Sequence, residues 1–221
     1  MRVSSAAMAE LSLTVDVHWT SPYALSAFVG LKEKGLAFDV EPVALQRKEH
    51  HRADYLASSL TGRVPRLRHG DFHLSESSAI DEYLEEAFPP PGYPALFPSD
   101  LRERARARQL MAWVRSDLMP IREERSTYTL FYERTSKPLS ARAEAAATRV
   151  LAVADALLAP GRTTLFGAFC IADVDFALML QRLLWNGYPA PPKVKAFADA
   201  QWARPSVRAW IEQKRPVYEP Y

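Results

Sequence analysis

The sequence has few of the residues that several large functional classes require. Only one cysteine, Cys170, occurs among the 221 residues, so no internal disulfide and no multi-cysteine metal site can form. The net charge of +2 gives no electrostatic argument for nucleic acid or for an anionic membrane surface as a partner. No window approaches the roughly 20 consecutive apolar residues that a membrane-spanning helix needs. These absences predict a globular protein of the reducing cytoplasm that contacts neither nucleic acid nor membrane.

A proline-rich stretch divides the chain. Five prolines fall within the eleven positions that begin at Pro89, a composition that excludes a helix or a central strand and predicts a stiff linker over residues 89–100. An α/β domain is expected over residues 11–88 and an all-helical domain over residues 101–221. Residues 1–10 lack the long apolar segment of a signal peptide and are interpreted as an N-terminal extension.

The first half of the chain alternates between strand and helix patterns. Residues 13–19 alternate apolar and polar side chains, as a half-buried strand does, and a helical pattern follows. Residues 38–41 predict a second strand, so the three elements form a βαβ unit with parallel strands. The polar segment 46–62 is ambiguous, residues 64–74 predict a hairpin, and a helix begins near Ser77. The expected order is βαβ-α-ββα.

The second half predicts helices throughout. The helix over residues 101–126 carries an apolar stripe, and we expect it to kink at Pro120. An alanine-rich helix follows over 140–158. The helix over 171–184 is so apolar that it must be buried on most sides. Two shorter helices are expected around 194–203 and 206–214.

Ser21 lies on the turn between the first strand and its helix. Pro22 suits the first helical position, so the Ser21 hydroxyl lies beside the positive end of the helix dipole. A hydroxyl there can help to bind an anion, or it can simply cap the helix. From these residues alone the two interpretations are equally supported.

Five short motifs resemble those of the cytosolic glutathione S-transferase family, in the same order and with similar spacing over residues 11–215. They are Ser21-Pro22-Tyr23, Val64-Pro65, Glu76-Ser77-Ser78-Ala79-Ile80, Ile171-Ala172-Asp173 and Arg204-Pro205-Ser206-Val207. Longer strings, such as Ile-Arg-Glu-Glu-Arg-Ser, are similar to the bacterial YfcF-type members in particular. The resemblance implies a thioredoxin-like N-terminal domain, an all-α C-terminal domain, and glutathione as co-substrate without a metal.

The resemblance also implies a role for each residue that would contact glutathione. Ser21 would stabilise the thiolate of glutathione instead of acting as a nucleophile. Val64 would present its backbone to the cysteinyl unit, beside a cis peptide bond at Pro65. From the residues alone a trans bond is the safer expectation, because only about one X–Pro bond in twenty is cis. Glu76 would pair with the γ-glutamyl ammonium and Ser77 would bind the γ-glutamyl carboxylate.

The glycine carboxylate of glutathione needs a cation or a hydrogen-bond donor. His50 is the candidate by similarity, and Arg63 and Lys48 are its competitors. The same basic run is also typical of a solvated loop.

The second domain supplies the remaining candidates. The resemblance implies a pocket for the electrophile between the domains, lined by Tyr23, Met111, Trp113 and Arg115. Trp113 is equally consistent with an ordinary core position. Asp173 is interpreted as a structural capping residue of a buried helix, with Cys170 where the family has Ser or Thr.

Together these features predict a detoxifying glutathione transferase that conjugates glutathione to a hydrophobic electrophile. A glutathione-dependent peroxidase is a close variant, and an isomerase is also open. A homodimer is implied by the resemblance alone. The alternative is a non-catalytic glutathione-transferase-like module that keeps the fold for binding or dimerisation. The intact motifs at Ser21, Val64 and Glu76 argue against that alternative.

Overall fold

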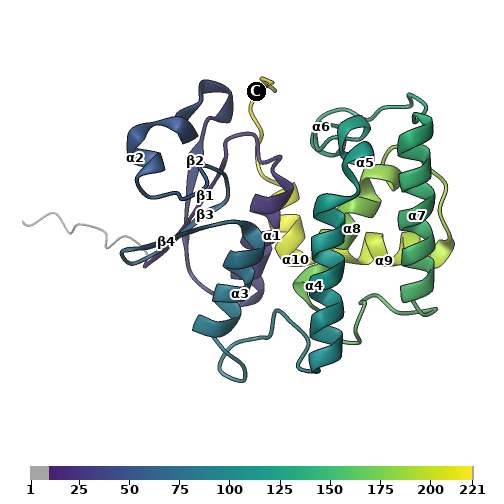
Figure 1. The fold of residues 1–221 in the computed structure, drawn as a ribbon, viewed down its shortest axis with the longest axis horizontal. Helices are drawn as coiled ribbons and strands as arrows, with labels where there is room; N and C mark the ends of the chain where they lie inside the picture. Colours follow the sequence, from purple (N-terminus) through teal and green to yellow (C-terminus); the bar gives the residue numbers. More distant parts are fainter. Residues whose placement is uncertain (1–9, 221) are drawn as a thin grey trace, which may run out of the picture.

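Residues 10–220 are described by the computed structural model, and they form two units that lie side by side (Figure 1). Four strands and their helices make the N-terminal unit, and helices make the C-terminal unit. The extension expected over residues 1–10 lies, apart from Glu10, outside the described residues. Within the described chain, no helix combines the length and apolar character needed to cross a membrane.

The N-terminal unit is built on a mixed four-stranded sheet with the order β2-β1-β3-β4. Its elements are β1 (Leu11–Asp16), α1 (Pro22–Glu33), β2 (Asp39–Val43), β3 (Arg66–His69), β4 (Phe72–Ser75) and α3 (Ser77–Ala87). β1 and β2 run parallel, whereas β3 is antiparallel to both β1 and β4. The segment 46–62, which the sequence pattern does not assign, lies in a stretch that forms two 3-10 turns, η1 (Leu45–Arg47) and η2 (Glu49–His51), and the one-turn helix α2 (Ala53–Leu56). The order βαβ-α-ββα is confirmed.

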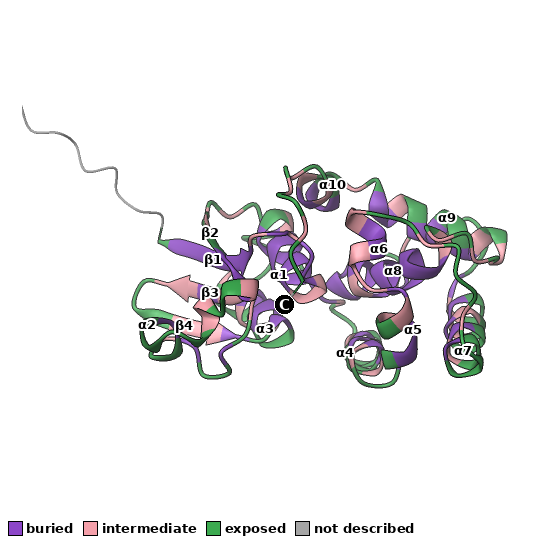
Figure 2. Ribbon diagram, turned by 90° about the horizontal axis from the view of Figure 1, so that it is seen from above, coloured by how far each residue is buried: buried purple, intermediate pink, exposed green. Residues whose placement is uncertain are grey.

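Helix α1 lies where the two units meet. It packs against β1 and α3 on its own side and against α8 and α10 of the helical unit. Every residue from Ala24 to Leu31 is buried, as the colouring of Figure 2 shows. A helix enclosed in this way cannot shift without disturbing both units, so its N-terminus is a fixed point between them.

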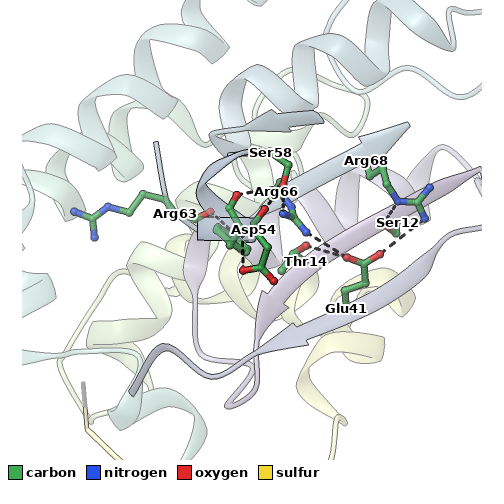
Figure 3. A network of polar contacts seen from close by, with 9 residues as sticks. Ser12, Thr14, Glu41, Asp54, Ser58, Arg63, Arg66 and Arg68 are labelled. Carbon is green, nitrogen blue, oxygen red and sulfur yellow. Dashed lines mark hydrogen bonds and ion pairs between the residues drawn. The ribbon is translucent and has the colours of Figure 1, made fainter. Parts of the chain in front are cut away.

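A polar network ties β1, β2 and β3 together (Figure 3). The carboxylate of Glu41 accepts hydrogen bonds from Thr14 Oγ1 and Arg66 Nη2, each at 3.4 Å, and Arg68 Nε donates to Ser12 Oγ at 3.1 Å. The guanidinium of Arg63 points away from this network in Figure 3. Arg66 and Arg68 are therefore engaged by the sheet, whereas Arg63 is directed elsewhere.

The helical unit has α8 (Ile171–Leu184) near its centre, packed against α4, α9 and α1. The surrounding helices are α4 (Leu101–Ser116), α5 (Met119–Glu124), α6 (Tyr128–Phe131), α7 (Ala141–Leu157), α9 (Pro192–Trp202) and α10 (Pro205–Ile211). The kink expected at Pro120 is wrong, because the chain breaks into two helices there. α4 ends at Ser116, and Pro120 lies in the first turn of α5, where proline is tolerated because no intrahelical N–H bond is lost.

The proline-rich segment between α3 and α4 is anchored to both units. Leu96 and Phe97 are buried. The backbone N–H of Leu96 donates to the Glu85 carboxylate at 2.9 Å, and its carbonyl accepts from Ile171 N at 2.8 Å. Because one residue bonds α3 and the start of α8, this segment fixes the two units relative to each other.

Candidate functional site

A cavity of about 570 Å³ opens between the two units. The N-terminal ends of α1 and α3 border it on one side, and α4, α5 and α8 border it on the other. Nine of the residues expected to form the site line this cavity: Ser21, Tyr23, His50, Arg63, Val64, Pro65, Glu76, Ser77 and Arg115. Residues far apart in the sequence are therefore brought to one place.

Ser21 is the N-cap of α1 and is 6% exposed. Its Oγ accepts a hydrogen bond from Ala24 N at 3.2 Å. The hydroxyl proton of Ser21 has no acceptor among the described residues, so it can be donated to a ligand. Capping and ligand binding, which the sequence leaves as alternatives, are thus compatible in one side chain.

Asp16, at the end of β1, holds the turn that carries Ser21. Its buried carboxylate accepts from Ser21 N at 2.9 Å and from Thr20 N and Oγ1 at 2.8 and 2.9 Å. No motif in the sequence predicts a role for Asp16. An acidic side chain that ends a strand and precedes an N-cap serine is the signal that would have found it, since Asp commonly bonds nearby backbone N–H groups.

The Val64–Pro65 peptide bond is cis. Pro65 lies immediately before β3, and Val64 lines the cavity. The backbone N–H and C=O of Val64 make no hydrogen bond within the described chain. Both groups are therefore available to the backbone of an extended ligand, which would bind as an added strand does.

Glu76 and Ser77 form the start of α3. Glu76 is its N-cap residue, with φ 72° and ψ 114°, and Ser77 is buried. The Ser77 Oγ accepts a hydrogen bond from Arg115 Nη2 at 3.1 Å. The free N–H groups of the first turn make this end of α3 a favourable place for an anion.

Arg115 connects this helix end to buried acids of both units. It forms an ion pair of 2.7 Å with Asp175 on α8. Burial alone would lower the pKa of Arg115, but the charges of Asp175 and Asp81 outweigh burial and raise it. Asp81, whose Oδ2 accepts from Ser26 Oγ at 3.1 Å, is fully buried, and burial followed by repulsion from Asp175 raises its pKa well above the usual range.

His50 and Arg63 lie at the same edge of the cavity. Burial, followed by the neighbouring charges of His51 and Arg63, lowers the pKa of His50. A neutral imidazole at neutral pH can donate one hydrogen bond but supplies no charge. Arg63 is exposed and directed away from the sheet network, so it is the better source of positive charge for a carboxylate.

The structure does not bring Met111 and Trp113 to this cavity. Met111 is buried in the core at 4% exposure. Trp113 lies two residues before Arg115 on α4, so it points to nearly the opposite face of the helix. There it lines a separate cavity between α4 and α7, with the guanidinium of Arg149 5.8 Å from its ring centroid. These two pocket assignments are therefore corrected. Helical periodicity explains the position of Trp113, whereas Met111 shares the face of Arg115 but is buried in the core one turn earlier.

Arg122 and Arg182 line the cavity where the sequence analysis expects no arginine. Arg122, on α5, donates Nη2 to the hydroxyl of Tyr23 and Nη1 to the carbonyl of Arg115 at 2.9 Å. Arg182, on α8, is 3% exposed and donates Nη1 to the carbonyl of Arg125 at 2.8 Å. A charged side chain inside a predicted buried helix is the signal that would have pointed to Arg182, because arginine is rarely buried without a role.

Asp173 lies outside the cavity, in the first turn of α8. It is fully buried, and its carboxylate accepts from Leu165 N at 2.7 Å and from Cys170 N at 2.8 Å. A capping box joins Cys170 and Asp173. Within the described residues, no group of three His, Cys, Asp or Glu side chains is placed to hold a metal ion.

Two family models match this chain. Residues 20–87 match the glutathione S-transferase N-terminal domain, and residues 100–214 match the glutathione S-transferase C-terminal domain. Glutathione S-transferase 3 of Zea mays is 30% identical over 210 residues, which is 90% of this chain and 88% of the relative. Maleylacetoacetate isomerase of Pseudomonas aeruginosa is 43% identical, over 42% of this chain and 44% of that protein.

Solved structures are similar over nearly the whole chain. A glutathione transferase homolog from Burkholderia GL BGR1, with bound glutathione, has a TM-score of 0.77 and 46% identity, covering 91% of this chain and 96% of that one. A theta class glutathione S-transferase from Xanthomonas axonopodis pv. citri, also with glutathione bound, has a TM-score of 0.73 and covers 94% and 99%. At 21% identity this second structure bears on the fold alone.

Proposed function

The chain belongs to the glutathione S-transferase family, and from that premise we propose that it catalyses attack by the glutathione thiolate on an electrophilic second substrate. Its fold is the thioredoxin-like domain and helical domain of that family, as the sequence predicts, and glutathione is its co-substrate. The observation that carries the proposal is the meeting of Ser21, Val64-Pro65 and Glu76-Ser77 at one cavity. The narrower YfcF-type resemblance stays a prediction.

We assign the parts of glutathione by the chemistry of the cavity wall. The γ-glutamyl carboxylate meets the α3 N-terminus and Ser77, and its ammonium meets Glu76. The cysteinyl backbone pairs with the free N–H and C=O of Val64, which leaves the glycine carboxylate toward Arg63 and His50. This arrangement directs the cysteinyl sulfur toward Ser21 at the N-terminus of α1.

Ser21 accelerates the reaction by stabilising the thiolate before attack. A free thiol of this type has a pKa of about 8.5, so only a small fraction is ionised at neutral pH. A hydrogen bond from the Ser21 hydroxyl and the positive end of the α1 dipole both favour the ionised sulfur. Asp16 is a positioning residue, because it orients the turn without reaching the sulfur.

The test is Ser21→Ala, with Ser116→Ala on the exposed surface of α4 as the matched control. Loss of one hydrogen bond to a charged group should raise the pKa of the bound thiol by about one to two units. The conjugation rate at neutral pH should fall by about tenfold or more, while calorimetry shows glutathione still bound. The pKa of the bound thiol is measured from the ultraviolet absorbance of the thiolate. An unchanged pKa in Ser21→Ala would show that Ser21 only caps the helix.

Reduction of a hydroperoxide by the same thiolate is the second candidate activity, and it uses the same Ser21 contact. The non-catalytic module predicts a different outcome. Such a protein could bind glutathione but would turn over neither an electrophile nor a hydroperoxide. A conjugation assay and a peroxide assay on the unmodified protein separate these cases.

Two broader expectations accompany this proposal. We propose a homodimer that works in the cytoplasm, where a chain with one buried cysteine needs no oxidising environment. Sedimentation equilibrium measures the assembly directly, and a monomer at micromolar concentration would reject the dimer.

A further inference from the structure

The helical unit contributes two further arginines to the cavity that Ser21 lines. Arg122 comes from α5 and Arg182 from α8, and Tyr23 lines the same two cavities as both arginines. The guanidinium of Arg122 lies 5.4 Å from the Tyr23 ring centroid. Two arginines from separate helices therefore line the same cavity as Ser21, and one of them contacts Tyr23, two residues along the chain from Ser21.

Within the described chain, neither guanidinium has a carboxylate partner. Arg182 gives Nη1 to a backbone carbonyl, and its buried Nε has no hydrogen-bond partner. Arg122 donates to a carbonyl and to the Tyr23 hydroxyl only. Other arginines between the units differ, since Arg115 pairs with Asp175 and Arg204 with Glu33.

Three acids line the two adjoining cavities that Arg122 and Arg182 share, and none of them pairs with either arginine within the described chain. Asp175 is bound by Arg115 at 2.7 Å. Glu76 lies at the start of α3 and is assigned to the ammonium of glutathione. Glu123 is 56% exposed and lies 4.0 Å from Arg142 on the outer surface. Burial, followed by repulsion from Arg122, lowers the pKa of Arg182 to about 9, so the guanidinium is still charged at neutral pH.

Buried positive charge without a counter-ion is unfavourable unless something supplies the opposite charge. Glutathione does not need these groups, since the α3 N-terminus and Arg63 serve its own carboxylates. Resting on the proposed function, we propose that the second substrate is an anionic electrophile whose carboxylate is bound by Arg122 and Arg182. This assignment differs from the hydrophobic electrophile that the family resemblance implies. The planar guanidinium matches a carboxylate with two parallel hydrogen bonds.

A matched pair of substrates tests the proposal on the unmodified protein. The para-chloro-meta-dinitrobenzoate anion and the corresponding benzamide have nearly the same shape and differ in charge. In both, a C–S bond forms at the chlorine-bearing carbon, the C–Cl bond breaks, and chloride leaves with the electron pair. The thiol proton passes to the buffer. Dividing each kcat/KM by the uncatalysed rate with free glutathione removes the difference in intrinsic reactivity.

The normalised kcat/KM of the benzoate should exceed that of the benzamide by about tenfold or more, because a charge-assisted pair is stronger than a neutral one. Equal values, or a preference for the benzamide, would overturn the anion site while leaving the proposed function intact. If the protein turns over neither of these substrates and also fails to turn over a neutral chlorodinitrobenzene, the result would instead count against the proposed function.

Variants then assign the preference to residues. Arg182→Met and Arg122→Met should each reduce the preference for the benzoate over the benzamide by about tenfold, mainly by raising the KM for the benzoate. Arg162→Met, an exposed position distant in sequence, is the control and should change neither. Because Arg122 is only half-buried, the Arg122→Met variant still tests the proposal if the Arg182 variant fails to fold. If calorimetry shows that both variants lose glutathione binding instead, the guanidiniums serve glutathione and the proposal is wrong.

Discussion

Glu76 holds a backbone conformation that L-residues rarely adopt. Its φ of 72° is accessible to glycine without penalty, whereas a side chain there costs of order 1–3 kcal/mol. The conformation persists because Glu76 joins β4 to α3, where the helix N-terminus must face the cavity. Strain of this kind is typical of ligand-binding positions, and it fits the proposed contact between Glu76 and the glutathione ammonium.

Glu76→Gly should therefore stabilise the fold while weakening the site. We expect the free energy of unfolding to rise by about 1 kcal/mol after allowing for the greater chain entropy of glycine. Glutathione affinity should fall by about tenfold, because the carboxylate partner is lost. Denaturant unfolding and titration calorimetry measure the two effects. Glu76→Gln, which keeps the strained backbone and removes the charge, should lose affinity without gaining stability. If the Glu76→Gly protein is less stable than the unmodified protein, the inference that the backbone of Glu76 is strained is wrong.

At the scale of elements, the sequence predicts a helix or strand correctly where the spacing of apolar side chains within that one segment is enough to define it. The βαβ crossover, the hairpin at residues 64–74 and the buried helix α8 all follow from side-chain spacing. The break between α4 and α5 does not, because residues 101–126 keep one apolar stripe across it. Arg122 and Arg182 escape notice for a related reason: their partners come from other helices, which no local spacing reveals.

Helix α8 should carry a pH-dependent part of the stability through Asp173. Burial raises the pKa of this carboxyl to about 6, against an ordinary value of 3.8, although hydrogen bonds from Cys170 and Leu165 oppose the shift. The folded state thus holds the proton more tightly than the unfolded state. The resulting stabilisation is complete below pH 3.8, is lost as the pH rises through about 6, and amounts to about 3 kcal/mol.

Asp173→Asn isolates this contribution, because the carboxamide does not titrate. The variant should be less stable at every pH, since its amide can accept only one of the two backbone hydrogen bonds. The difference between the two proteins should be largest near pH 4 and should shrink as the pH rises to 7. Denaturant unfolding at several pH values measures it. A difference that stays constant with pH would show that Asp173 has the same pKa in both states.

At the scale of the molecule, one buried carboxylate joins the two units. Glu85, on α3, accepts from Lys34 Nζ at 2.6 Å, from Leu96 N at 2.9 Å and from Arg104 Nη2 at 3.1 Å. These partners follow α1, lie in the proline-rich segment and lie on α4, respectively. Glu85 is 5% exposed and Lys34 only 1%. The cavity depends on the same alignment, because its walls come from both units.

Removing this carboxylate should destabilise the whole protein. Glu85→Ala leaves the Lys34 ammonium buried with only the Phe88 carbonyl, 2.8 Å away, as a partner among residues 10–220. Breaking a buried pair from one side costs about 3–5 kcal/mol. The double variant Lys34→Met with Glu85→Ala also removes the unpaired ammonium and should recover part of the lost free energy of unfolding. The effects of the two substitutions on stability are therefore not additive. Denaturant unfolding of the single and double variants gives the coupling free energy, and additive losses would show that Lys34 and Glu85 act independently. Arg104→Met removes only the half-exposed partner and should cost about 1 kcal/mol or less.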